Sequence, residues 1–216
     1  MRTRNIAFIA AAVMAVATAA SAAPVVSLSN IGDPNTLPAG EELIADFNDA
    51  GNPEATLVSG FTLDLVGATV GVNEGGTGYS GTLPNDPTHY LTVPGGAKAT
   101  LTSVRALRSF SLYMGSPDTY NSIRFIGDNG YDFTLTGAQI SAGYVGQSWT
   151  WGQRINFDFG GYNVKKVVLT SAANSYEVDN FAANAVPEPG TWALMITGFG
   201  GAGAMLRRRR TASTFA

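Results

Sequence analysis

The chain has 216 residues, no cysteine and a single histidine, His89. Without cysteine there is no disulfide framework and no thiolate chemistry, and a Ser–His–Asp triad or a multi-histidine zinc site would have to include His89. Six of the thirteen basic residues lie at the two ends, whereas all sixteen acidic residues lie between Asp33 and Glu188, so the region between the basic ends has a net charge of −9. Such an acidic region argues against a nucleic-acid partner, because a phosphate backbone needs clustered Lys and Arg.

Residues 1–22 have the three parts of a secretory signal peptide. Arg2 and Arg4 form the basic start, Ile6–Ala20 is a short apolar run, and Ala20-Ser21-Ala22 is a small-x-small cleavage site. An uncleaved membrane anchor is the alternative, but the run is short and the cleavage site is well formed. The sequence therefore predicts an N-terminal signal helix that signal peptidase removes after Ala22.

The region 23–185 predicts one all-β extracellular domain. Short runs rich in Val, Ile, Thr, Phe and Tyr recur between Gly, Pro, Asn and Asp clusters, and no sustained helical periodicity is present. The candidate strands are Glu42–Phe47, Phe61–Val66, Ala68–Val72, His89–Val93, Ala97–Ser103, Ser109–Met114, Ser122–Ile126, Tyr131–Thr136, Ile155–Phe159, Val164–Thr170 and Tyr176–Ala182. About ten strands of this kind predict a two-sheet antiparallel sandwich, jelly-roll-like in topology.

Two local patterns strengthen the β prediction. The alternation in Ser109–Met114 places Phe110, Leu112 and Met114 on one face of an extended strand. Gly127-Asp128-Asn129-Gly130 lies between two candidate strands and predicts a hairpin turn. After the last strand, Ala183–Pro187 is expected to form a short linker.

The C-terminal region combines a proline-rich neck, an apolar stretch and a basic cluster. Val186-Pro187-Glu188-Pro189-Gly190-Thr191 precedes the apolar run Trp192–Leu206, and four arginines follow it. The prolines favour an extended segment that a processing enzyme can reach. The run is as long as a short membrane span, and the arginines favour a cytoplasmic position. The sequence thus predicts a C-terminal transmembrane helix, with 211–216 as a cytoplasmic tail.

The order and spacing of these features resemble the PEP-CTERM sorting signal, in the variant where Trp-Ala follows Pro-Glu-Pro after two residues. The resemblance covers 186–210 and rests on Pro187, Glu188, Pro189, Trp192, Ala193, Arg207, Arg208, Arg209 and Arg210. It implies recognition by an exosortase, a Gram-negative bacterium, and an association with exopolysaccharide and with biofilm or floc formation. It also implies an inner-membrane intermediate that reaches the cell surface or the extracellular matrix. The alternative is a plain tail anchor with an incidental proline-rich neck.

The order of the strands is similar to that of β-sandwiches in other exosortase-dependent surface proteins. The likeness rests on the early segment Ala45-Asp46-Phe47-Asn48 and on the last strand, which includes Glu177 and Asp179. In jelly rolls the first and last strands often lie side by side, and a structural Ca²⁺ can bridge them. We therefore consider Asp46, Asn48, Glu177 and Asp179 as calcium ligands, since Ca²⁺ prefers oxygen donors. The competing interpretation is that these groups accept hydrogen bonds from nearby backbone N–H groups.

Aromatic side chains close to one another suggest a second kind of site. Trp149 and Trp151 lie on one face if their segment is extended, and with Tyr144 they would form a platform for stacking on sugar rings. Tryptophan pairs at this spacing also occur as ordinary packing, because each ring brings a large apolar area.

No catalytic residue is predicted, because no nucleophile and base occur in a recognisable arrangement. The favoured function is an exported surface or matrix protein sorted by an exosortase. Signal peptidase and exosortase are its expected processing partners, the membrane and exopolysaccharide its expected surroundings, and a structural Ca²⁺ its one candidate cofactor. A carbohydrate-binding module is the alternative, and an enzyme is the third class.

Overall fold

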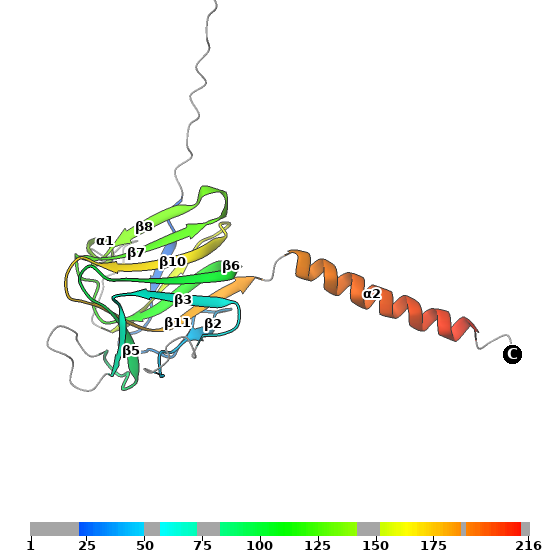
Figure 1. The fold of residues 1–216 in the computed structure, drawn as a ribbon, viewed down its shortest axis with the longest axis horizontal. Helices are drawn as coiled ribbons and strands as arrows, with labels where there is room; N and C mark the ends of the chain where they lie inside the picture. Colours follow the sequence, from blue (N-terminus) through cyan, green and yellow to red (C-terminus); the bar gives the residue numbers. More distant parts are fainter. Residues whose placement is uncertain (1–21, 50–56, 73–82, 142–151, 187–188, 213–216) are drawn as a thin grey trace, which may run out of the picture.

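The computed structural model describes residues 22–49, 57–72, 83–141, 152–186 and 189–212. The signal peptide, the aromatic residues Tyr144, Trp149 and Trp151, and the neck residues Pro187 and Glu188 lie outside these ranges. The described part consists mostly of antiparallel strands, followed by one separate C-terminal helix (Figure 1).

Eleven strands and two α-helices occur in the described residues. The strands are β1 Val25–Leu28, β2 Glu42–Ala45, β3 Phe61–Val66, β4 Thr69–Val72, β5 His89–Val93, β6 Lys98–Met114, β7 Asn121–Gly127, β8 Asp132–Thr136, β9 Gln153–Asp158, β10 Val164–Ser171 and β11 Tyr176–Val186. The helices are α1 Gly137–Ser141 and α2 Pro189–Ala212. Every predicted strand is present, and β1 is the strand that the sequence analysis missed.

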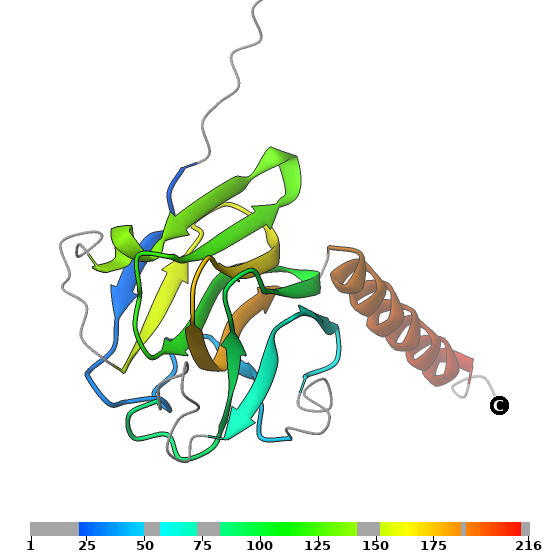
Figure 2. The ribbon, with the colours of Figure 1, turned by 60° about the vertical axis from the view of Figure 1, so that its left-hand side comes forward.

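The long strand β6 connects the two halves of the domain. Its first part, Lys98–Ser103, pairs with β3, and the same part pairs with β10. Its last part, Ser109–Met114, pairs with β9 and lies beside β11. The structure therefore differs from two separate sheets: one antiparallel sheet curls over on itself because two predicted strands, 97–103 and 109–114, are one continuous strand (Figures 1 and 2).

The curl brings aromatic rings from both halves into contact. The ring of Phe125 on β7 lies 4.8 Å from that of Phe157 on β9 and 6.5 Å from that of Phe110 on β6. Phe181 on β11 continues the cluster, with its ring 4.9 Å from that of Phe47. These residues are almost completely buried, so the core lies inside the curl.

The predicted hairpin joins β7 and β8. The two strands pair in antiparallel register from Ser122↔Thr136 to Ile126↔Asp132. In the turn, Asn129 has φ 57° and Gly130 has φ 77°, values that asparagine and glycine adopt more readily than other residues. The hairpin prediction is confirmed.

The strand β2 lies beside the last strand, as the sequence analysis expects for the early and last strands. Ala45 pairs with Phe181, and Glu42 pairs with Ala183. Beyond this pairing β11 continues to Val186, still in register with β6 at Ala106. The expected linker Ala183–Pro187 is therefore corrected: the strand leaves no spacer between the folded domain and the Pro-Glu-Pro neck.

The C-terminal helix α2 projects away from the domain (Figure 1). Each of its side chains that the structure describes is exposed, including Leu194, Ile196 and Phe199. In the described part of the chain, no helix combines the length and apolar character needed to cross a membrane. The helix itself is confirmed, and its place in the membrane stays a prediction.

Candidate functional site

The part of the sheet formed by β9, β11 and the last part of β6 has a polar face opposite to the core. On β9, Ile155 and Phe157 are completely buried in the core, so Arg154 and Asn156 lie on the other face. The register pairs Arg154 with Tyr113 and Asn156 with Ser111 on β6. We call the group Ser109, Ser111, Tyr113, Arg154, Asn156 and Asp179 the covered polar face.

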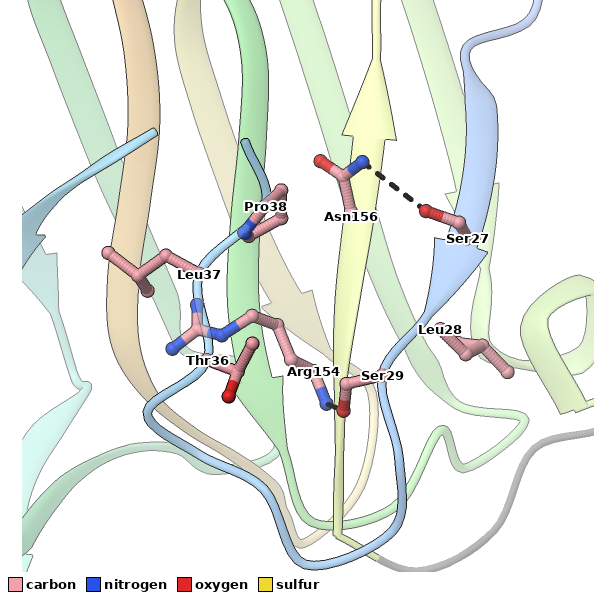
Figure 3. A pocket seen from close by; sticks show the side chains of 8 residues that line it. All are labelled: Ser27, Leu28, Ser29, Thr36, Leu37, Pro38, Arg154 and Asn156. Carbon is pink, nitrogen blue, oxygen red and sulfur yellow. Dashed lines mark hydrogen bonds between the residues drawn. The ribbon is translucent and has the colours of Figure 1, made fainter. Parts of the chain in front are cut away.

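The segment after β1 covers this face, and Arg154 holds it in place. The Arg154 side chain is only 1% exposed. Its Nη2 donates to the carbonyl of Pro34 at 2.5 Å, and its Nη1 donates to the hydroxyl of Ser111 at 3.0 Å and to the carbonyl of Asn180 at 2.7 Å. One guanidinium thus connects the covering segment to β6 and β11; Figure 3 shows Arg154 on β9 beside the residues of the covering segment Thr36, Leu37 and Pro38.

Several carboxylates surround this buried cation. Glu41 accepts hydrogen bonds from Ser109 at 2.6 Å and from Ser111 at 2.5 Å. Burial lowers the pKa of Arg154 to about 10, and attraction to Glu41, Asp179 and other acidic groups opposes that shift. The guanidinium therefore stays protonated at neutral pH. Burial also raises the pKa of Glu41, while the bonds from the serines and the charge of Arg154 favour its ionised form.

A pair of acidic side chains, Asp86 and Asp179, lies next to Arg154. Asn180 donates from its backbone N–H to Asp179 at 2.6 Å and from its side-chain amide to Asp86 at 2.9 Å. Thr88 donates to Asp86 at 2.5 Å and lies 3.4 Å from Asp179. Burial, followed by repulsion from the charge of Asp86, raises the pKa of Asp179 to about 9. Asp179 is therefore protonated at neutral pH and hydrogen-bonded to Asp86.

Replacing Asp179 by asparagine should make the domain more stable at alkaline pH. The folded protein keeps the Asp179 proton up to about pH 9, whereas an unfolded chain releases it near pH 4, roughly the ordinary carboxyl pKa. Wild-type stability therefore falls as the pH rises through this range. Asparagine has the shape of the protonated acid and does not titrate. We expect the melting temperatures of wild type and Asp179→Asn to be close to each other at pH 4. At pH 8 the melting temperature of Asp179→Asn should be higher by about 4–8 °C, which corresponds to a difference of about 2 kcal/mol in the free energy of unfolding.

The matched control for this prediction is Asp64→Asn, at an exposed position on β3. It should leave the melting temperature within about 2 °C of wild type at both pH values. The difference in melting temperature between wild type and Asp179→Asn could instead be the same at pH 4 and at pH 8. That result would show that Asp179 is ionised in the folded protein.

The four predicted calcium ligands do not form a metal site. Within the described residues, no group of three or more His, Asp or Glu side chains is placed to hold a metal ion. Asp46 accepts a hydrogen bond from the backbone of Asn48 at 3.2 Å, Glu177 accepts one from the hydroxyl of Ser175, and Asp179 is bonded to Asn180. The pairing of β2 with β11 is as expected, but the carboxylates bind nearby protein groups instead of converging.

The other predicted site residues are only partly described. The aromatic platform of Tyr144, Trp149 and Trp151 lies outside the described residues and stays a prediction. Of the sorting residues, Pro189, Trp192, Ala193 and Arg207–Arg210 belong to α2. Sequence reasoning missed Arg154, Glu41 and Asp86. The available signal was the position of Arg154. It lies in the alternating segment Gln153–Asp158, and the region between the basic ends has only seven basic residues.

Comparison with protein families decides the nature of the C-terminal region. Residues 185–210 match the PEP-CTERM protein-sorting motif. The chain carries a PEP-CTERM sorting motif. This motif marks an exported protein that an exosortase processes for sorting to the cell surface. It covers the neck and most of α2, starting in the last residues of β11.

The described domain has distant likenesses among solved structures. Tailspike protein 4 of bacteriophage CBA120 is 15% identical, with 66% of this chain and 22% of that chain covered and a TM-score of 0.30. TmCBM61, solved with beta-1,4-galactotriose, is 12% identical, with 59% and 90% covered and a TM-score of 0.31. The xylanase 10B of Clostridium thermocellum, solved with xylohexaose, is 9% identical, with 70% and 29% covered and a TM-score of 0.34.

With TM-scores this low, these structures support no functional conclusion for the PEP-CTERM chain. The chain also spans less than a third of the length of two of them. No curated protein matches its sequence.

Proposed function

We propose that this protein is a non-enzymatic component of the bacterial surface or extracellular matrix, sorted by an exosortase and retained with exopolysaccharide in a biofilm or floc. The match of residues 185–210 to the PEP-CTERM sorting motif carries the proposal. The acidic domain without cysteine is in keeping with a position outside the cell, where its charge keeps it soluble.

The geometry of the C-terminus supports removal of the tag after folding. The strand β11 is paired with β6 up to Val186, and α2 begins at Pro189. No side chain that the structure describes in α2 is buried. Cleavage in the neck would therefore leave the core of the domain intact, and the mature protein would keep all eleven strands.

The proposal is tested by comparing an exosortase-producing bacterium with the same strain lacking its exosortase. With the exosortase present, the protein should be found at the cell surface in a shortened form. Without it, the unprocessed chain should stay with the cells. Equal amounts of shortened protein at the surface of both strains would contradict sorting by an exosortase.

Two further expectations belong to this proposal. The contact of Phe125 with Phe157 across the two halves of the curled sheet supports a jelly-roll-like sandwich. A carbohydrate-binding role is the second candidate function, with the platform predicted for Tyr144, Trp149 and Trp151 as its site.

A further inference from the structure

Two short segments lie at the place where the neck leaves the domain. The first is 104–108 in the middle of β6, and the second is 160–166, which leads from the turn after β9 into β10. Val186, the last residue of β11, pairs with Ala106 in the first segment. Figure 1 shows α2 leaving the domain where β11 ends beside β6. We call the segments 104–108 and 160–166 together the neck-side end.

Two hydrogen bonds join these segments into one surface. Nζ of Lys165 donates to the carbonyl of Val104 at 2.8 Å. Nη1 of Arg108 donates to the carbonyl of Gly161 at 3.0 Å. Both bonds use a basic side chain and a backbone oxygen, so they fix the positions of the two cations without neutralising their charge.

Basic residues gather at this end of an otherwise acidic domain. The region between the basic ends of the chain has only seven of them, and four lie in the neck-side end, which contains no acidic residue: Arg105, Arg108, Lys165 and Lys166. Asp128 and Asp158 border this end, since Asp128 donates from its backbone N–H to residue 163 and β9 ends at Asp158. Glu42 lines a pocket together with Arg105. The neck-side end is therefore slightly positive, whereas the rest of the domain is negative.

Apolar side chains are exposed among these basic residues. Val104 is 64% exposed and Tyr162 is 39% exposed. A surface that mixes cations with exposed apolar groups suits the headgroup layer of an anionic membrane, where the cations meet phosphates and the apolar groups reach the acyl boundary. A dissolved polyanion would satisfy the cations only, because it offers nothing to the apolar side chains.

The length of the neck places this surface close to whatever receives α2. Two residues, 187 and 188, separate Val186 from Pro189, where α2 begins. Three steps of about 3.8 Å between neighbouring Cα atoms span no more than about 11 Å. Exposed apolar side chains of α2, such as Leu194 and Phe199, favour a lipid surface as the receiver. Charges act over about 8–10 Å at physiological salt, so the basic residues come within reach of lipid headgroups.

We propose that the neck-side end docks on anionic phospholipid headgroups of the inner membrane before the sorting tag is removed. Its basic side chains contact lipid phosphates, and Val104 and Tyr162 enter the headgroup layer between them. The inference rests on the proposed sorting by an exosortase, because it concerns the unprocessed chain at the membrane. A few basic residues bind an anionic surface only weakly, so cleavage in the neck releases the domain.

A dye on a single introduced cysteine tests the docking, since the chain has no cysteine of its own. The protein is the exported chain 23–216, with an environment-sensitive dye on Val104→Cys. The matched control is Val66→Cys, which is 51% exposed and lies at the far end of β3, opposite Lys98. With vesicles of phosphatidylglycerol and phosphatidylethanolamine, we expect the fluorescence at position 104 to rise about twofold or more and that at position 66 to stay unchanged. Vesicles of phosphatidylcholine alone should leave both unchanged.

Charge variants show whether the basic residues cause this response. Arg105→Gln combined with Arg108→Gln should shift the ratio of docked to undocked domain about tenfold toward the undocked form. Lys98→Gln combined with Arg124→Gln removes the same charge at exposed positions outside the neck-side end, and it should dock as wild type does. Thermal unfolding of each variant shows that the domain is folded. Sodium chloride at 0.5 M should reduce the response of the wild type strongly.

The outcomes separate this docking from the sorting proposal. No response at position 104, an equal response at position 66, or an unchanged response in the variant of Arg105 and Arg108 refutes the docking. A larger response to dissolved alginate than to the anionic vesicles also refutes it and identifies an acidic polysaccharide as the partner. Exosortase-dependent shortening is read in parallel: normal shortening without a lipid response refutes the docking and leaves the sorting role standing.

Discussion

Arg154→Met should lower the melting temperature of the domain by about 6–20 °C, or prevent folding. Methionine fills much of the same volume but leaves the buried Glu41 without its nearby cation. It also leaves the carbonyls of Pro34 and Asn180 without their donor. Each buried acceptor that loses its donor costs about 1–3 kcal/mol, so the two carbonyls and the lost attraction to Glu41 together cost about 3–5 kcal/mol, and about 2–4 °C of melting temperature corresponds to each kcal/mol in a domain of this size. Thermal unfolding followed by circular dichroism measures the difference.

Arg124→Met is the matched control for this change. Arg124 forms an ion pair with Asp132 in which both side chains are about half exposed. Exposed pairs contribute about 0–1 kcal/mol, so this variant should lose no more than about 4 °C. Equal losses for the two variants would mean that Arg154 stabilises the fold no more than a surface arginine does.

Replacing Pro187-Glu188-Pro189 by three alanines should abolish exosortase-dependent shortening and surface display. Proline favours an extended neck and the start of a helix, and the helix α2 begins at Pro189. Alanine is the strongest helix former, so the change allows α2 to extend toward Val186 and removes the sequence that the enzyme recognises. We expect at least a tenfold loss of shortened protein in immunoblots of surface fractions.

Asp64→Ala serves as the control for this experiment, because Asp64 is exposed on β3 and lies outside the sorting motif. It should be shortened and displayed like wild type. Normal shortening of the triple-alanine variant would show that processing does not depend on the neck.

The sequence predicts the parts of this protein that depend on local patterns. Alternation predicts which face of the segment 109–114 packs into the hydrophobic core, and the Asn129-Gly130 pair predicts the hairpin between β7 and β8, because both depend on neighbouring residues only. The sorting motif is local in the same sense. Its order of neck, apolar run and arginines can be recognised in the sequence without any knowledge of the fold.

The covered polar face could not be predicted in this way. The partners of Arg154 come from the segment after β1, from β6 and from β11, so its role appears only once these segments are placed together. The calcium prediction had the right pair of strands, β2 and β11, but not the directions of their carboxylates. For Asp179 the decisive neighbour was Asp86, more than ninety positions away in the sequence.

The intact mass of the protein recovered from the cell surface tests most directly whether the PEP-CTERM motif directs processing of an exported protein. We predict that the surface protein begins at Ala23, after signal peptidase cleavage, and ends within the neck, at 187–189. The mature form would then keep β11 and lack Trp192 and everything beyond it. A surface protein whose mass includes the arginines Arg207–Arg210, or that still begins at Met1, would contradict the account.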